Sequence, residues 1–303
     1  MTLAVVILTF NEAHHIGRAI DSVAGIASDI YIIDSGSTDD TAAIARAKGA
    51  QVLVHAFVNH AAQFQWGLEN APIKADWIMR LDADEVIEPD LARTIAARLD
   101  TLPLEVTGVN LKRKHVFLGR WIKHGGRYPL ILLRIWRCGV GSVEQRWMDE
   151  HVVLSHGETV TFDGGFADIS LGDIGFFTAK HNSYATKEAV EVLANRHGLF
   201  SRGERAPASA QAARKRRLKE GVYNKLPFGV GPTLYFLYRY FWQFGFLDGK
   251  EGAIYHGLQG FWYRYLVDAK VLELERAIAH LHEPSAQLAE LRRLTGLKLT
   301  DER

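Results

Sequence analysis

The chain has 303 residues, enough for one large domain or two modest ones with a substantial core. Its 36 lysine and arginine residues balance 35 aspartate and glutamate residues, so the overall charge gives no reason to expect nucleic acid as a partner. The single cysteine, Cys138, excludes an internal disulfide and fits a reducing compartment, so we expect a cytoplasmic protein. Neither a signal peptide nor an uncharged apolar stretch of about 18 residues is evident, so no spanning helix is expected.

The first hundred residues alternate between strand and helix patterns. Continuous apolar runs indicate buried strands, and apolar residues at helical spacing follow each of them. Strands are expected over 3–9, 30–34, 52–55 and 77–81, and helices over 14–23, 38–47, 61–69 and 89–99. This alternation predicts an α/β fold with a mainly parallel sheet covered by helices on both faces.

The pattern changes after Pro103. Shorter apolar pieces between glycine-bearing turns predict a mixed extension of the sheet, and helical spacing then returns. The strands are expected over 106–112, 130–136, 152–154 and 159–162, and the helices over 177–197, 208–222, 257–281 and within 283–303. The sequence therefore predicts an α/β domain over residues 1–200 and a helical C-terminal region over 201–303.

Aspartates stand at the ends of two predicted strands. Asp34 closes the strand at 30–33, and Asp82 and Asp84 follow the strand at 77–81. In an open α/β sheet, ligands bind outside the carboxyl ends of the strands, so these carboxylates should face a substrate. A pair of carboxylates there can hold a divalent cation that keeps substrate phosphates as further ligands. The residues therefore indicate an enzyme that handles nucleotides.

Each of these acidic segments also has a simpler interpretation. Ser37 or Thr38 can cap the following helix, with Asp39 and Asp40 favourable in its first turn. Capping leaves Asp34 unexplained, because a carboxylate at the end of a buried strand must find donors, and a base or ribose hydroxyl would provide them. Asn11 can likewise cap a helix or meet a base. Glu85 can be a solvated or capping charge.

Three motifs in order resemble those of family 2 glycosyltransferases: Val6–Glu12, Asp34–Thr41 and Leu81–Glu85. That family consists of inverting enzymes that use nucleotide sugars and have a GT-A fold. Trp121–Pro129 and Leu133–Arg137 further resemble the branch that builds lipopolysaccharide core and exopolysaccharides. The resemblance implies a nucleotide-sugar-binding half over residues 1–100 and an acceptor half over 101–200.

The resemblance also implies roles for individual residues. Asp34 and the loop after the first strand would hold the nucleotide base, and Asp82 would hold the ribose. Asp84 would bind the Mg²⁺ or Mn²⁺ that sits on the diphosphate. The nucleotide-sugar-binding set implied in this way is Thr9, Phe10, Asn11, Glu12, Asp34, Ser35, Arg80, Asp82 and Ala83.

A catalytic base is expected in the acidic pair Asp149-Glu150. In the resembling family a late acidic residue, often the glutamate of a His-Glu pair, is the base. Here Asp149 replaces that histidine, so both residues stay open and Glu150 is favoured because it aligns with the glutamate. Such a carboxylate would take the proton of the acceptor hydroxyl during sugar transfer with inversion. The alternative is a solvated acidic loop.

Four cationic residues are candidates for contact with the diphosphate. Arg134 and Arg137 offer forked donors that suit phosphate, but on an exposed strand they would simply be polar residues. Lys180 and His181 belong to the segment Lys180–Tyr184, which resembles a Lys-x-Asn-x-Tyr element of the same branch. The alternative for these two residues is a solvated helix face.

The C-terminal region combines a basic run, Arg214–Lys219, with an aromatic segment, Tyr235–Phe246. This combination suits the surface of an anionic bilayer, so we expect peripheral contact with the inner face of the plasma membrane. A solvated basic helix with aromatic core packing, or a dimer interface, is the alternative.

The expected function is metal-dependent, inverting transfer of a sugar from a nucleotide diphosphate sugar, a UDP-sugar for preference, to a cell-envelope glycan or glycolipid. A nucleotidyltransferase is one alternative, although it should show a glycine-rich basic loop after the first strand. A catalytically silent nucleotide-sugar-binding protein is the other. The donor sugar, the acceptor and the oligomeric state are left open by the sequence.

Overall fold

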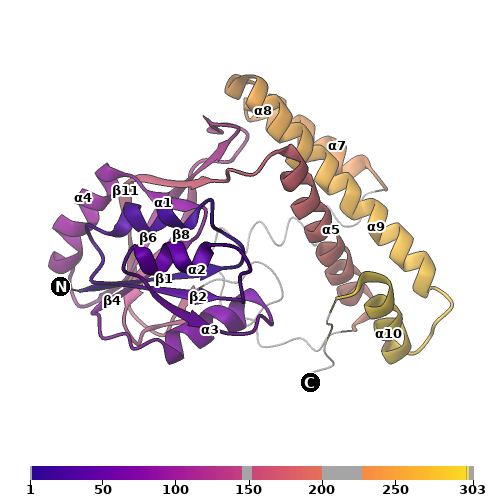
Figure 1. Ribbon diagram of the computed structural model, residues 1–303. Helices are drawn as coiled ribbons and strands as arrows, with labels where there is room; N and C mark the ends of the chain where they lie inside the picture. The colour runs from indigo at the N-terminus through magenta and orange to yellow at the C-terminus, as the bar shows by residue number, and fades with distance from the viewer. Residues whose placement is uncertain (1, 145–151, 200–226, 298, 300–303) are drawn as a thin grey trace. The chain divides into compact units, whose positions relative to one another are not determined.

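The computed structural model describes residues 2–144, 152–199, 227–297 and 299 (Figure 1). Its contacts divide the chain into two units, Met1–Leu171 and Gly172–Arg303. The division comes earlier than the predicted domain boundary at residue 200. The reason is that helix α5, Ile174–His197, packs its apolar residues on α9 of the second unit.

The first unit is built on a sheet of nine strands within its described residues. The strand order is β3-β2-β1-β4-β8-β6-β11-β5, and β7 pairs with β6. The pairs β3-β2, β2-β1, β1-β4 and β6-β11 are parallel, and the others are antiparallel. The strands are β1 Leu3–Thr9, β2 Asp29–Asp34, β3 Gln51–Val54, β4 Trp77–Asp82, β5 Glu85–Ile87, β6 Val106–Phe117, β7 Arg120–Trp121, β8 Leu130–Arg137 and β11 Glu158–Ile169. The predicted mainly parallel sheet with a mixed extension is confirmed.

Helices cover both faces of this sheet (Figure 1). One face carries α1 Ile16–Val23, α2 Thr41–Ala47 and α4 Pro89–Arg98, which continues into the 3-10 turn Leu99–Thr101. The other face carries α3 His60–Asn70 and a small two-stranded sheet of β9 Gly141–Val143 and β10 Val152–Leu154.

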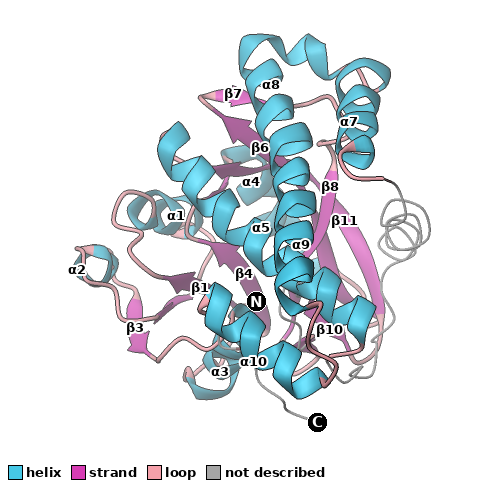
Figure 2. Ribbon diagram, turned by 90° about the vertical axis from the view of Figure 1, so that its right-hand side faces the viewer, coloured by secondary structure: helices cyan, strands magenta, loops and turns pink. Residues whose placement is uncertain are grey.

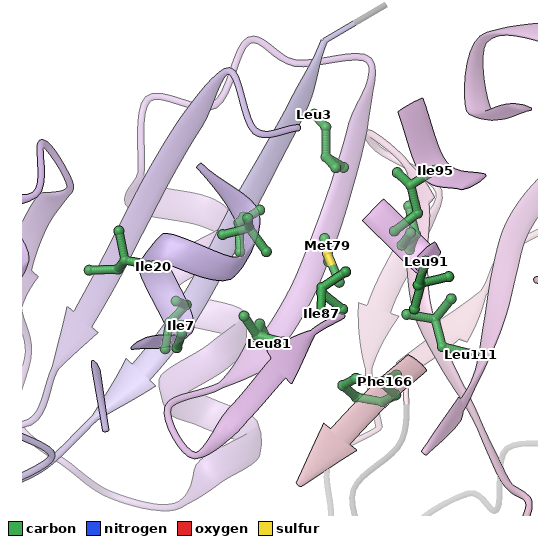
Figure 3. Close-up of a cluster of buried hydrophobic side chains, with 14 of the residues drawn as sticks. Leu3, Ile7, Ile20, Met79, Leu81, Ile87, Leu91, Ile95, Leu111 and Phe166 are labelled. Carbon is green, nitrogen blue, oxygen red and sulfur yellow. The ribbon is translucent and has the colours of Figure 1, made fainter. Parts of the chain in front are cut away.

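The central position of β1 in the sheet explains why its sequence is apolar without interruption. Successive strand residues point to opposite faces, and both faces of β1 are buried. Leu3, Val5 and Ile7 pack toward α1 and α4, whereas Ala4 and Val6 pack toward α3. Figure 3 shows the first of these clusters, in which side chains of β1 and β4 meet those of α4. This packing fixes the ends of the central strands.

The second unit is helical in its described residues. Its core pairs Ala185, Ala189 and Leu193 of α5 with Val267 and Val271 of α9. The elements after α5 are α7 Val230–Leu237, a π-helical turn Tyr238–Trp242, a 3-10 turn Gly245–Asp248, α8 Gly249–Tyr255, a π-helical turn His256–Trp262, α9 Tyr263–Ile278 and α10 Pro284–Thr295. The helix predicted over 257–281 is thus a π-helical turn that runs into α9. The helix predicted over 208–222 lies outside the described residues.

Within the described part of the chain, no helix is long and apolar enough to cross a bilayer.

Candidate functional site

The carboxyl ends of three parallel strands bring the predicted acidic residues to one edge. Thr9 at the end of β1 lies opposite Asp34 at the end of β2, and Leu8 lies opposite Asp82 at the end of β4. Thr9 and Asp34 are buried, while the Phe10 ring just beyond β1 is 58% exposed. The edge therefore combines fixed polar groups with an exposed aromatic ring.

The Asp34 carboxylate has four donors from the chain itself. Its Oδ1 accepts hydrogen bonds from the backbone N–H groups of Gly36 and Ser37 at 3.0 and 2.8 Å. Its Oδ2 accepts from the hydroxyls of Thr9 and Ser37 at 2.8 and 2.6 Å. Burial by itself would raise the pKa of Asp34, but these hydrogen bonds outweigh it and the pKa lies below its ordinary value. The donors that we expected from a ligand are thus already present.

The loop after β1 is held against the loop after β2 by its backbone N–H groups. Asn11, which has a left-handed φ of 55°, also accepts from the Thr38 N–H through its side-chain oxygen at 2.9 Å. The three N–H donations are Asn11 to the Ser37 hydroxyl at 2.9 Å, Glu12 to the Thr41 hydroxyl at 2.7 Å and Ala13 to the Asp39 carboxylate at 3.1 Å. The two loops therefore form one unit around the Asp34 carboxylate.

The expected helix caps are wrong. Helix α2 begins at Thr41, and the Asp39 carboxylate accepts from the Thr41 N–H at 3.0 Å. The Ser37 hydroxyl instead donates to Asp34, and Thr38 donates to Asn11. Asn11 is no cap of α1 either, because that helix begins at Ile16.

Ser35 continues the contact between the two strand ends. Its N–H donates to the Thr9 carbonyl at 2.9 Å, and its hydroxyl accepts from the Gln63 amide of α3 at 3.1 Å. This predicted nucleotide-binding residue therefore also links the loop after β2 to α3.

A buried ion network lies at the end of β4. Arg134 of β8 donates from Nη2 to Asp82 Oδ2 at 3.0 Å and to Glu85 Oε1 at 2.5 Å. Arg80 Nε lies 3.3 Å from Asp82 Oδ1, and the Asp82 N–H donates to Glu85 Oε2 at 3.0 Å. The Glu85 side chain is completely buried, so its interpretation as a solvated or capping charge is wrong.

The network continues into β6 and β11. Arg113 of β6 donates to Glu85 at 3.1 Å and lies 3.8 Å from Asp168 of β11, which is 3.1 Å from His115 Nδ1. We did not predict from the sequence that Arg113, His115 and Asp168 belong to the site, nor that Glu85 is buried in it. One signal was available, because Arg113 and His115 are two residues apart and so share one face of a strand.

The charges in this network set the protonation of its members. Burial opposes ionisation of Asp82, but Arg134, Arg80 and Arg113 pull its pKa far below the ordinary value. For Glu85, burial and the neighbouring Asp82 raise the pKa against the pull of Arg134 and Arg113. Despite burial, the hydrogen bond from His115 and the charges of His115, Arg113 and Arg127 lower the pKa of Asp168 to about 2. Asp82 is therefore a salt-bridged anion.

Asp84 occupies the turn between β4 and β5. Its backbone carbonyl accepts from the Ile169 N–H at 2.9 Å, and Arg18 Nη2 lies 3.5 Å from the same oxygen. The neighbouring Ala83 packs its methyl group into the core. The turn is therefore held through its backbone and through Ala83, while the Asp84 side chain is partly exposed.

The fit of a divalent cation depends on how many protein ligands it needs. No group of three or more His, Cys, Asp or Glu side chains is arranged to hold a metal in the part of the chain that the structure describes. Asp82 is engaged by two arginines. A cation of the Mg²⁺ type needs only one or two carboxylates when substrate phosphates and waters complete its shell. Asp84 fits that mode of binding, with a cation bound mainly through the substrate.

The structure brings Arg134 to this edge but not Arg137. Arg137 lies opposite Trp77 at the amino end of β4, stacks over its ring at 4.5 Å and donates to the carbonyls of Leu102, Pro103 and Val106. Arg137 therefore lies away from the edge that carries Asp82 and Asp84, because β8 is antiparallel to β4 and carries its last residue to the opposite edge.

Lys180 and His181 belong to helix α5 of the second unit. Lys180 Nζ lies 5.9 Å from the Phe176 ring, and the His181 ring stacks on Phe177 at 3.8 Å and meets Tyr263 edge-on at 5.4 Å. His181 thus has packing partners within its own unit. The two candidates for the catalytic base, Asp149 and Glu150, lie outside the described residues.

Residues 4–153 match the model of the family described as Glycosyl transferase family 2. The chain therefore belongs to that family through its first unit. With the mixed, largely parallel sheet and the helical C-terminal region, the family match agrees with the GT-A fold implied by the motifs.

Two relatives illustrate the extent of similarity. An uncharacterized glycosyltransferase of Rickettsia felis is 42% identical over 85 residues, which cover 28% of this chain and 29% of that protein. The match thus spans less than a third of that relative's length. The lipopolysaccharide core biosynthesis glycosyltransferase LpsC of Rhizobium meliloti is 24% identical over 275 residues, which cover 84% of this chain and 89% of that protein.

Among solved structures, the chain matches glucosyl-3-phosphoglycerate synthase of Mycobacterium tuberculosis in a complex with Mn²⁺, UDP and glucosyl-3-phosphoglycerate. The TM-score is 0.32 at 25% identity, with 37% of this chain and 44% of that one covered.

Proposed function

We propose that the protein is an inverting glycosyltransferase that moves a sugar from a nucleotide diphosphate sugar to a glycan or glycolipid of the cell envelope. The observation that carries the proposal is the shared edge of Thr9, Asp34 and Asp82, with Asp84 in the turn beyond it. Carboxylates at the carboxyl ends of parallel strands lie where α/β sheets bind nucleotides. The match to glycosyl transferase family 2 over these residues supports the reaction class.

Each part of this edge has a role in the proposal. The loops after β1 and β2 hold the base, and Asp82 meets the ribose from its salt-bridged position. Asp84 holds Mg²⁺ or Mn²⁺, which offsets the negative charge of the diphosphate when bound. Glu150 or Asp149 takes the proton of the acceptor hydroxyl, so that the oxygen attacks the sugar carbon as the diphosphate leaves.

The loop after β1 does not support the alternative function, nucleotidyl transfer. Such enzymes would need a loop whose backbone N–H groups cradle phosphates. Here the N–H groups of Asn11, Glu12 and Ala13 all donate to side chains of the neighbouring loop. We therefore place the diphosphate at the Asp84 turn.

The acceptor and the cellular location are also part of the proposal. The match to LpsC over most of both chains favours a lipopolysaccharide core or a related lipid-linked saccharide as the acceptor. Such an acceptor would place the enzyme in the cytoplasm, at the inner face of the plasma membrane.

Exposed aromatic side chains in the second unit support membrane contact. Trp242 is 78% exposed, and Phe241 and Phe244 are 55% and 57% exposed. Between Val230 and Leu247, Arg239 is the one charged residue and it is buried. Aromatic rings on an uncharged surface suit the headgroup region of a bilayer.

A panel of nucleotide sugars with Mn²⁺ tests the proposed function. We expect one nucleotide sugar to raise the melting temperature, because ligand binding stabilises the native state, and to be turned over with a lipid-linked saccharide acceptor. Binding without hydrolysis or transfer across the acceptor panel would show a silent binding protein. Release of pyrophosphate from a nucleoside triphosphate and a sugar phosphate would show a nucleotidyltransferase.

A further inference from the structure

The segment from Val106 to Val143, which forms β6, β7, β8 and β9, is unusually basic. It contains no aspartate or glutamate, although the whole chain has a formal net charge of only +1. Its lysine and arginine residues are Lys112, Arg113, Lys114, Arg120, Lys123, Arg127, Arg134 and Arg137. The first unit thus carries a local excess of positive charge that the overall composition hides.

Acidic residues from other elements offset the charge on the strands. Lys112 pairs with Asp163, Lys114 lies 2.7 Å from Glu88, and Arg113 and Arg134 share Glu85. Arg137 is satisfied by backbone carbonyls. All of these contacts are made by basic residues of β6 and β8.

Strand β7 pairs with the last residues of β6 (Figure 2). This hairpin end carries Arg120, Trp121 and Lys123, and Arg120 and Lys123 are both exposed. Two ammonium groups flank the Trp121 ring, since Lys114 Nζ lies 5.0 Å and Lys123 Nζ 5.4 Å from its centroid. The Tyr128 ring meets Trp121 edge-on at 4.9 Å. We call Arg120, Trp121 and Lys123 the hairpin patch. It offers cationic donors beside a fixed aromatic ring.

The sheet pairing places the hairpin patch on the same edge as Asp84. The Ile169 N–H donates to the Asp84 carbonyl, Ile169 lies opposite Val116, and Val116 lies opposite Trp121. With neighbouring strands roughly 4.8 Å apart, these three steps separate Asp84 from Trp121 by about 14 Å. A diphosphate on a metal at Asp84 therefore ends short of the hairpin patch, which is left to the other substrate.

We propose that the hairpin patch binds a phosphate group carried by the acceptor saccharide. This inference rests on the proposed function. Arginine and lysine bind phosphate through charge-assisted hydrogen bonds, and the cation–π contact with Trp121 holds the Lys123 ammonium group in place. A patch of this size, three residues within four positions of one hairpin, suits a single phosphorylated sugar. A nucleic acid would need cations along an extended path.

A binding experiment with glucose 1-phosphate and glucose tests this inference. Saturating UDP and Mn²⁺ keep the donor site filled, and saturation-transfer NMR measures the affinity of each sugar. We expect wild-type protein to prefer the phosphorylated sugar by roughly tenfold, as charge-assisted contacts of about 1.4 kcal/mol would give. The double variant Arg120→Gln/Lys123→Gln should lose that preference, whereas Lys123→Arg should keep it.

The matched control is Lys74→Gln, which removes an exposed lysine from the loop that precedes β4 at the opposite edge of the sheet. It should behave as wild type, and all variants should keep the thermal shift with UDP and Mn²⁺. An unchanged preference in the double variant, or an equal loss in Lys74→Gln, would overturn the inference. So would binding to phosphatidylglycerol vesicles that depends on Arg120 and Lys123 with no preference between the sugars. Absence of the UDP shift in wild type would instead count against the proposed function.

Discussion

Arg134 Nη2 lies 3.0 Å from Asp82 Oδ2, in a contact that joins β8 to the end of β4. The same nitrogen contacts Glu85, so one guanidinium holds both ends of the turn that carries Asp84. Glu85 is completely buried and Arg134 nearly so. The position of the proposed metal-binding carboxylate therefore depends on a buried ion pair that does not touch the metal itself.

Arg134→Met should destabilise the first unit strongly. Removing one partner of a buried ion pair leaves the other charge uncompensated, at a cost of about 3–5 kcal/mol. Urea unfolding measures the change, and the double variant Arg134→Met/Glu85→Gln should recover part of the loss. A change below about 1 kcal/mol in the single variant would show that the pair is not a structural anchor.

Ser37→Ala should loosen the two loops that we propose hold the base. The Ser37 hydroxyl donates to the Asp34 carboxylate and accepts from the Asn11 N–H, so its loss removes a hydrogen bond to a charged group at a cost of about 2 kcal/mol. We expect a lower urea midpoint and weaker UDP binding. The exposed Ser183→Ala in α5 is the control. Equal midpoints for the two variants would contradict the role of Ser37.

His115 should make stability depend on pH. Burial, together with the charges of Arg127 and Arg113, lowers the pKa of His115 below 6.5 in the folded protein, despite its contact with Asp168. Below pH 6.5 the unfolded chain therefore takes up a proton before the folded protein does, so stability falls as the pH falls. The variant His115→Asn should lose less stability between about pH 7.5 and about pH 5.5. A steeper loss in the variant would reverse the assignment.

The exposed aromatic residues of the second unit should support membrane contact. Trp242→Ala and Phe244→Ala should reduce flotation with phosphatidylglycerol vesicles, because both rings are largely exposed. Leu104→Ala removes another exposed apolar side chain, from the first unit, and serves as the control. Wild-type protein that stays wholly in the soluble fraction at low salt would rule out this contact.

The layout of the first unit could be predicted because it depends on local patterns. The continuous apolar run at 3–9 and the strand-end aspartates indicated the buried parallel strands and their shared edge. Their order in the sheet and the pairing of Thr9 with Asp34 could not be predicted from these runs, because an apolar strand that is buried on both faces does not distinguish one register from another.

The partners of the charged residues could not be predicted in the same way. Glu85 and Arg134 are 49 residues apart, and Asp168 and His115 are 53 apart, so nothing local relates them. Arg137 was misplaced for a related reason. The direction of β8 relative to β4 decides which end of that strand reaches the site, and its apolar pattern is the same in either direction.

The start of helix α2 was mispredicted because several residues compete for its N-terminus. Ser37 and Thr38 are ordinary caps, yet their hydroxyls serve the neighbouring strand end and loop. A long-range contact thus outweighed a local preference, and Asp39 accepts from the first helical N–H instead.

Asp84 is proposed to bind the metal on the donor diphosphate. Calorimetry of UDP binding with and without Mn²⁺ tests it directly in wild type, in Asp84→Asn and in the control Asp29→Asn at the start of β2. Urea unfolding of each variant separates a loss of metal binding from a loss of stability, because the Asp84 carboxylate also attracts Arg18. We predict that Mn²⁺ strengthens UDP binding at least about tenfold in wild type and in Asp29→Asn, but not in Asp84→Asn. Equal Mn²⁺-dependent binding in Asp84→Asn and wild type would contradict the account.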